Sequence, residues 1–153
     1  MARPDNPASV YLDSNTLIKA IIKEPGWEPV AAVLRLAEAN KLALMISNLT
    51  YVEARGWRKG EPYPPELDQR CLAALDSPWM IRVELSRRTA LRARRYAYSH
   101  RLGNYDALHL ASAVEAEADV LMTTDKELLR VQYVDGVWIG EPYQLGDPTL
   151  FDA

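Results

Sequence analysis

Four acidic residues of this sequence stand where carboxylates can do chemistry: Asp13, Glu53, Asp106 and Asp125. Asp13 and Asp125 come just after short hydrophobic runs, and the other two lie near the starts of segments with helical spacing. Carboxylates at such places are expected to be partly buried, and burying a lone charge is costly. Clustered carboxylates also repel one another, which raises their pKa values unless a cation lies between them. Four acids gathered in one place would form a cation site, although their spacing alone does not establish that they meet.

A hard divalent cation would offset both the cost of burying these charges and the repulsion between the carboxylates. Mg²⁺ prefers oxygen ligands, takes one or two carboxylates directly and keeps several waters. Such a metal lowers the pKa of a bound water and neutralises charge on a phosphoryl group. For each acid taken alone an alternative stays open, because an acidic residue at a helix start commonly caps backbone amides and suits the helix dipole.

The elements that must position these acids alternate between strands and helices. Short apolar runs predict strands at 9–12, 42–46, 79–83, 119–123 and 137–139. Helix-start residues and helical spacing predict helices from Ser14 to a break at Pro25–Gly26, after Pro29, over 49–57, over 66–75, over 86–101, from a cap at Asn104, and over 125–130. Such alternation implies a parallel sheet covered on both faces. Sites in these folds lie at the carboxyl ends of the strands, where Asp13 and Asp125 are expected.

The composition is that of an ordinary folded chain. With 153 residues, 48% hydrophobic and 25% charged, we expect one domain over 1–153. The net charge of −3 does not by itself suggest a nucleic-acid partner. The single cysteine, Cys71, excludes an internal disulfide and favours a reducing compartment. No apolar run reaches about 18 residues and no signal-peptide pattern is present, so we expect a cytoplasmic protein without a membrane span.

Four segments carry a resemblance to a known family. They are VYLDSNTLIKAII at 10–22, SNLTYVEA at 47–54, NYDALHLASA at 104–113 and VLMTTDKEL at 120–128. The sequence resembles the PIN-domain nucleases, most closely the VapC-type toxins of prokaryotic toxin–antitoxin pairs. The segments contain the four acids in the family's order and approximate spacing, and the resemblance spans a core at about 9–140. A loop at Gly60–Pro65 and a tail after Gly140, with Pro142 and Pro148, look like departures from the compact toxins.

The resemblance implies a fold, an activity and partners. The fold would be a three-layer α/β/α sandwich with a central, mainly parallel sheet. The activity would be Mg²⁺- or Mn²⁺-dependent endoribonuclease cleavage, in which a metal-activated water hydrolyses an RNA phosphodiester bond. The four acids would be catalytic, with Asp13, Asp106 and Asp125 as metal ligands; which acid acts as general base stays open. A cognate antitoxin and a homodimer would be the protein partners.

Two polar residues and one histidine stand beside the acids. Asn15 and Thr123 match family positions whose side chains would orient a carboxylate or a water. Alternatively, Asn15 is a helix-start residue and Thr123 an ordinary strand-end threonine. His109 shares a helix face with Asp106, and we expect a structural role for it.

An arginine cluster precedes the Asp106 helix: Arg87, Arg88, Arg92, Arg94, Arg95 and Arg101. Arg88, Arg92 and Arg95 share one helix face, and next to a metal site that face could hold RNA phosphates. Alternatively, the cluster is a solvated face or contacts an acidic antitoxin segment.

Two other functions stay open at this stage. One is a PIN-like nuclease that acts in RNA processing or DNA metabolism outside toxin–antitoxin systems. The other is a non-catalytic binding module with the same fold, although the complete set of four acids counts against it.

Overall fold

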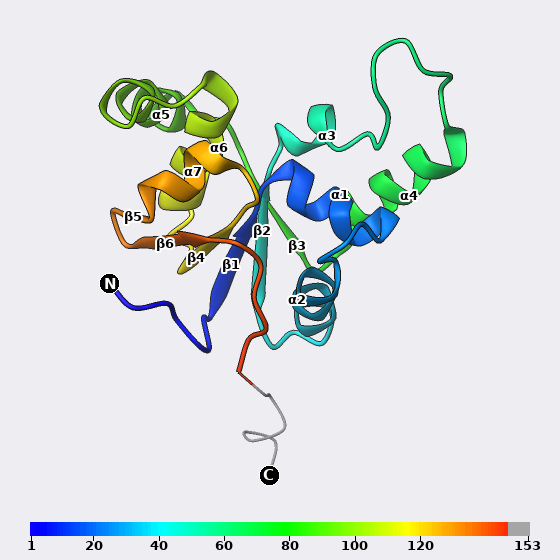
Figure 1. Ribbon diagram of the computed structural model, residues 1–153, viewed down its shortest axis with the longest axis horizontal. Coiled ribbons are helices and arrows are strands. Elements are labelled where there is room, and N and C mark those ends of the chain that lie inside the picture. Colours follow the sequence, from blue (N-terminus) through cyan, green and yellow to red (C-terminus); the bar gives the residue numbers. More distant parts are fainter. Residues whose placement is uncertain (147–153) are drawn as a thin grey trace.

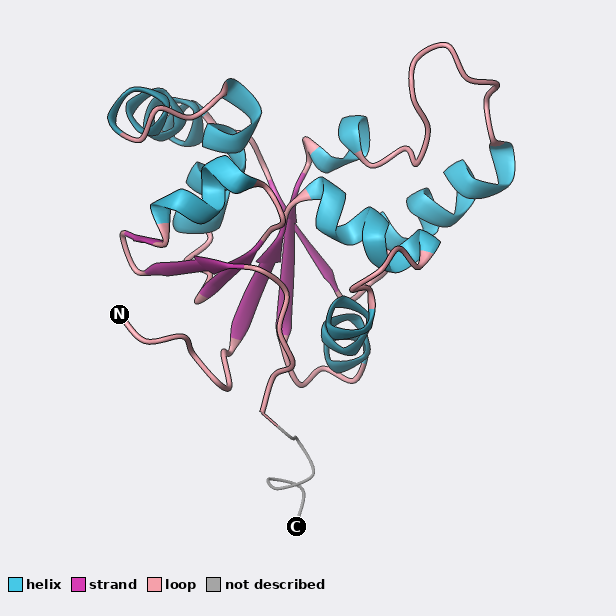
Figure 2. Cartoon of the chain, viewed as in Figure 1, coloured by secondary structure: helices cyan, strands magenta, loops and turns pink. Residues whose placement is uncertain are grey.

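The computed structural model describes residues 1–146 of the chain. Six strands form one sheet in the order β3-β2-β1-β4-β6-β5 (Figure 2). Their bounds are β1 Ser9–Leu12, β2 Ala43–Ser47, β3 Met80–Val83, β4 Val120–Met122, β5 Tyr133–Val134 and β6 Val137–Gly140. Every neighbouring pair is parallel except β5 and β6, which are antiparallel.

Helices cover both faces of this sheet. They are α1 Ser14–Ile22, α2 Glu28–Glu38, α3 Thr50–Glu53, α4 Pro65–Leu75, α5 Arg87–Ser99, α6 Asn104–Glu115 and α7 Lys126–Val131. Figure 1 shows α1, α2 and α4 on one side of the sheet and α5, α6 and α7 on the other. The expected α/β/α sandwich with a mainly parallel sheet is confirmed. Within residues 1–146, none of the helices is long and apolar enough to cross a membrane.

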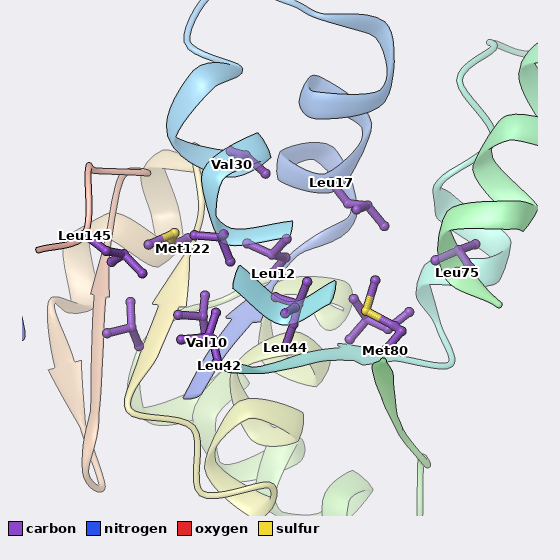
Figure 3. Packing of buried hydrophobic residues seen from close by; sticks show 14 of the residues in the cluster. Val10, Leu12, Leu17, Val30, Leu42, Leu44, Leu75, Met80, Met122 and Leu145 are labelled. Atoms are coloured by element: carbon purple, nitrogen blue, oxygen red, sulfur yellow. The ribbon is translucent and has the colours of Figure 1, made fainter. Parts of the chain in front are cut away.

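Side chains of the central strands alternate between two cores, as a period of two requires. Val10 and Leu12 of β1 lie in the core with α1 and α2, whereas Tyr11 between them lies in the core with α5 and α6. Figure 3 shows the first core, where Leu17 of α1 and Val30 of α2 lie above β1. Because β1 is buried on both faces, the position of the residue that follows it is firmly fixed.

The segment after β2 differs from expectation. A helix was expected over 49–57, but α3 ends at Glu53. Gly56 has a left-handed backbone with φ of +69°, and a Cβ there would lie 2.6 Å from Cδ2 of Leu67 on α4. A helix cannot pass through such a residue, so the chain turns away and forms a loop over 54–64 that ends where α4 begins.

Two further expectations are corrected. Gly103, not Asn104, occupies the N-cap position of α6, and no side chain caps that end. The strand expected at 137–139 is β6, but its antiparallel partner β5 was not expected. Asp135 and Gly136 connect the two with φ values of 45° and 92°. Such angles are typical of a two-residue Asp-Gly hairpin turn, so the sequence did contain the signal.

The tail after Gly140 packs against the start of the chain. The Tyr143 hydroxyl donates to the carbonyl of Pro4 at 2.5 Å, and the Gly146 amide donates to the carbonyl of Asp5 at 2.9 Å. The expected extension is therefore attached to the body as far as the structure describes it. Pro148 lies in residues 147–153, outside the described part.

Candidate active site

The centre of the sheet is a topological switch point. From β1 the chain continues to β2 on one side, and it later returns as β4 on the other side of β1. β1 and β4 pair in parallel, with Leu12 opposite Met122. The next residues, Asp13 and Thr123, therefore leave the sheet side by side at its carboxyl edge, where ligands of open α/β sheets bind.

Asp13 is almost fully buried, at 5% exposure, and both its oxygens are engaged. Oδ1 accepts a hydrogen bond from the Thr16 amide at 3.0 Å and so caps α1. Oδ2 accepts a hydrogen bond from the Thr123 hydroxyl. The same hydroxyl oxygen accepts a hydrogen bond from the Asp125 amide at 2.9 Å. Thr123 thus ties the two aspartates together, which is the geometry expected of an orienting residue.

Asp125 caps α7 through one of its two oxygens. Oδ1 accepts from the amides of Glu127 at 2.8 Å and Leu128 at 3.3 Å. Oδ2 makes no hydrogen bond with any residue in the described part of the chain. The capping alternative therefore holds for Asp125 as for Asp13, but in Asp125 it leaves one carboxylate oxygen available to a ligand.

The pKa of Asp106 depends on the other three acids. Burial raises its pKa to about 6, and the negative charge of Asp125 adds to this rise. Asp13 and Glu53 raise it further, while His109 opposes them. Each of the other three carboxylates thus acts on Asp106. The structure brings together all four acids that the sequence singled out.

Glu53 is held by a network of side chains. Ser14 donates to its Oε1 at 2.8 Å, and Nε2 of His109 lies 2.6 Å from the same oxygen. The other ring nitrogen of His109, Nδ1, lies 2.7 Å from the Tyr11 hydroxyl. Burial alone would raise the pKa of Glu53, but the hydrogen bonds from His109 and Ser14 outweigh it and hold that pKa below its usual value.

The sequence singled out neither Ser14 nor Tyr11 as a partner of this site. Both come from the β1–α1 segment, yet their contacts reach Glu53 of α3 and His109 of α6. His109 is 3% exposed, which agrees with the structural role expected for it. Contacts between residues so far apart in the chain cannot be predicted from local spacing. The hydroxyl of a buried strand tyrosine does, however, usually need a hydrogen-bond partner.

Asn15 lies in the first turn of α1, as the helix-start alternative has it. Its side chain is exposed and makes no hydrogen bond with a described residue, so an orienting role for Asn15 stays a prediction. The first turn of α1 places Asn15 outside and its neighbours Ser14 and Thr16 inside.

The arginine face on α5 is largely engaged within the protein. Nε of Arg88 lies 3.0 Å from Oε2 of Glu115 on α6, and Nε of Arg92 lies 2.5 Å from Oε1 of the same residue. The Arg92 side chain is only 20% exposed. Among the described residues Arg95 has no ion pair. Two of the three members of this face therefore fasten α5 to α6, and whether the face also holds RNA phosphates stays a prediction.

The donor set at this site fits a hard divalent cation. In the described part of the chain, no three His, Cys, Asp or Glu residues stand close enough to ligate one metal ion together. Mg²⁺ needs only one or two direct carboxylates, with waters filling the remaining positions. Burial raises the pKa of Asp106 most, and repulsion from the other carboxylates adds to the rise; a bound cation would relieve that repulsion.

Solved structures with this fold include three that cover most of the chain. A toxin–antitoxin complex from Klebsiella pneumoniae is 23% identical, with a TM-score of 0.63, over 89% of this chain and 99% of that chain. VapBC2 from Rickettsia felis, bound to a DNA fragment from its promoter, is 18% identical with a TM-score of 0.64, over 86% and 96%. VapC20 from Mycobacterium tuberculosis, a sarcin–ricin loop cleaving toxin, is 16% identical with a TM-score of 0.58, over 82% and 97%.

Sequence comparison identifies the family directly. No curated protein matches the sequence significantly. The family model described as PIN domain matches residues 10–133, which is well over half of the chain and includes all four acids. The chain therefore belongs to the PIN domain family.

Proposed function

We propose that this protein is a metal-dependent endoribonuclease, the toxin of a toxin–antitoxin pair, which hydrolyses RNA phosphodiester bonds. The observation that carries the proposal is the convergence of four carboxylates at the switch point of the sheet, where Thr123 joins Asp13 to Asp125 and His109 joins Glu53 to the helix that contains Asp106. Membership of the PIN domain family supports a nuclease. The three similar structures are a toxin–antitoxin complex, a VapBC complex on DNA and an RNA-cleaving toxin, which supports the more specific role.

The proposed roles follow from how each acid is held. Asp13, Asp106 and Asp125 hold Mg²⁺ or Mn²⁺, directly or through waters, and Thr123 orients Asp13. The bound cation supplies a lowered pKa for a coordinated water and neutralises charge on the phosphate. Glu53 is kept ionised by Ser14 and His109, so it accepts hydrogen bonds from water in the site.

The proposed partners are a cognate antitoxin and a second copy of the chain, and the proposed compartment is the cytoplasm. The first rests on the toxin–antitoxin complexes that share the fold. The homodimer and the compartment remain predictions from the sequence.

The activity is tested by incubating the purified chain with single-stranded RNA. Cleavage should require Mg²⁺ or Mn²⁺ and stop in EDTA. Asp106→Asn should lower the rate at least 100-fold, since it removes charge that the cation needs. Glu38→Gln, which neutralises an exposed acid on α2, is the matched control and should cleave normally. Cleavage that persists in EDTA, from a preparation free of contaminating nuclease, would overturn the proposal.

A further inference from the structure

RNA that reaches the four acids must bring phosphates toward carboxylates of the same sign. In the described part of the chain, no lysine or arginine forms an ion pair with any of the four acids. Cations beside the site must therefore hold the flanking phosphates. The loop over 54–64, which begins directly after Glu53, carries such cations.

The 54–64 loop carries three positively charged side chains. Arg55, Arg58 and Lys59 are all exposed. None of them forms an ion pair with a described residue. Arg88 and Arg92 on α5, in contrast, both pair with Glu115. The loop that follows Glu53 in the chain therefore offers positive charge outside ion pairs, whereas two arginines of the helix face do not.

The same loop presents aromatic rings. The Trp57 and Tyr63 rings pack edge to face with centroids 6.2 Å apart, and the Arg55 guanidinium lies 5.0 Å from the Trp57 ring centroid. Tyr63 is 58% exposed. Trp57 is half-buried, and its Nε1–H has no hydrogen-bond partner in the described part of the chain. An exposed ring beside cations is the combination that binds single-stranded nucleic acid.

The 54–64 loop is fixed at several points. Leu67 of α4 packs against Gly56 where a side chain would collide. At the other end the Tyr63 hydroxyl donates to Asp68 of α4 at 2.6 Å. Figure 1 shows the loop rising beyond α3, away from the sheet. A loop fastened in this way loses little conformational freedom on binding.

We propose that the 54–64 loop binds the single-stranded RNA that flanks the scissile bond, an inference that rests on the proposed function. Arg55, Arg58 and Lys59 contact phosphates, and the exposed ring of Tyr63, supported by Trp57, stacks on a base.

The phosphate contacts are tested by RNA binding in an Asp13→Asn background, where the substrate stays intact. A fluorescein-labelled 12-nucleotide single-stranded RNA is titrated by anisotropy at several NaCl concentrations. Arg55→Gln and Lys59→Gln should each weaken binding and reduce the slope of log affinity against log salt by about 0.7. Arg35→Gln, an exposed cation on α2, is the control and should leave the slope unchanged. Loop variants that behave like Arg35→Gln would overturn the proposal.

The stacking contact needs its own variant pair. Tyr63→Leu removes the ring and should weaken RNA binding roughly 5- to 150-fold, whereas Tyr63→Phe keeps the ring and should bind nearly as tightly as Tyr63. Because Tyr63 is exposed, neither change should unfold the protein, which circular dichroism checks. Equal affinity of the two variants would exclude stacking.

The outcomes separate this inference from the proposed function. If loop variants lose RNA affinity but the unmodified chain cleaves no RNA, the loop assignment stands and the nuclease proposal fails. If the unmodified chain cleaves RNA but the loop variants bind normally, the reverse holds.

Discussion

Thr123 shows how one hydroxyl can organise two acids. It donates to Asp13 and accepts from the Asp125 amide, so the ends of β1 and β4 are joined by a side chain as well as by the sheet. Asp13 and Asp125 each cap a helix as well. Structural and functional interpretations of these residues are therefore not exclusive, and variants must separate them.

Asp125 offers such a separation because asparagine also caps helices. Asp125→Asn keeps an oxygen for the amides of α7 and removes a charge from the cluster, so the melting temperature of the metal-free protein should stay the same or rise. Asp125→Ala loses the cap and should lower the free energy of unfolding by about 1 kcal/mol. Both variants should gain less stability from Mg²⁺ than the unmodified chain, measured by thermal melts with and without metal. An Asn variant as unstable as the Ala variant would mean that charge repulsion at this position is negligible.

Asp106 predicts how the stability of the metal-free protein depends on pH. Its pKa is about 6 in the fold against 3.8 ordinarily. A raised folded pKa gives a stabilising contribution that is complete below about 3.8 and is lost as the pH rises through about 6. We expect the unmodified chain to lose about 1–2 kcal/mol relative to Asp106→Asn between pH 4 and 7, with allowance for solvent screening of a partly exposed group.

The measurement is urea unfolding of both proteins in EDTA across that pH range. Taking the difference between the two proteins removes the contributions of other carboxyls, including Glu53, whose lowered pKa acts in the opposite direction. Parallel stability curves would show that Asp106 does not titrate near pH 6.

At the scale of elements, α5 and α6 are joined by a pair of arginines that share one partner. Arg88 and Arg92 both contact Glu115, but the Arg88 side chain is 79% exposed and the Arg92 side chain 20%. An exposed ion pair contributes little, whereas a charge-assisted hydrogen bond shielded from water contributes more. Arg92→Ala should therefore lower the free energy of unfolding by about 1–3 kcal/mol, and Arg88→Ala by less than about 0.5 kcal/mol.

Chemical denaturation of the two variants in the same buffer makes the comparison. Equal losses would show that exposure does not set the strength of these contacts. A drop in RNA affinity for Arg88→Ala without loss of stability would instead show that Arg88 contacts RNA.

Local patterns identified most elements because residues that favour turns or helix starts mark where most strands and helices begin and end. Pro25–Gly26 lies just beyond the end of α1, Pro65 begins α4, and the buried β1 is apolar from Val10 to Leu12. The helix expected over 49–57 was too long because apolar spacing alone did not reveal the left-handed backbone of Gly56, against which Leu67 of a different helix packs. The pair of Arg92 with Glu115 was missed for the same reason, because spacing within α5 says nothing about α6.

At the scale of the whole molecule, parallel strands bring their carboxyl ends to one edge, which predicts that two of the acids meet, whereas Glu53 and Asp106 were grouped with them only through the family resemblance. Order in the chain and the switch-point rule were sufficient for Asp13 and Asp125. The hydrogen bonds that hold Glu53 could not be predicted, since they join residues from three separate elements. Sequence patterns thus indicate which residues gather, and only the folded chain shows how each one is held.

Whether the four acids form a divalent cation site is best decided by anomalous diffraction from crystals grown with Mn²⁺. We expect an anomalous peak between Asp13, Asp106 and Asp125, bonded to one or two carboxylates and surrounded by waters. The peak should disappear in crystals of Asp106→Asn. Ordered carboxylates without a peak between them, in a protein that binds Mn²⁺ elsewhere, would show that the acids do not form such a site.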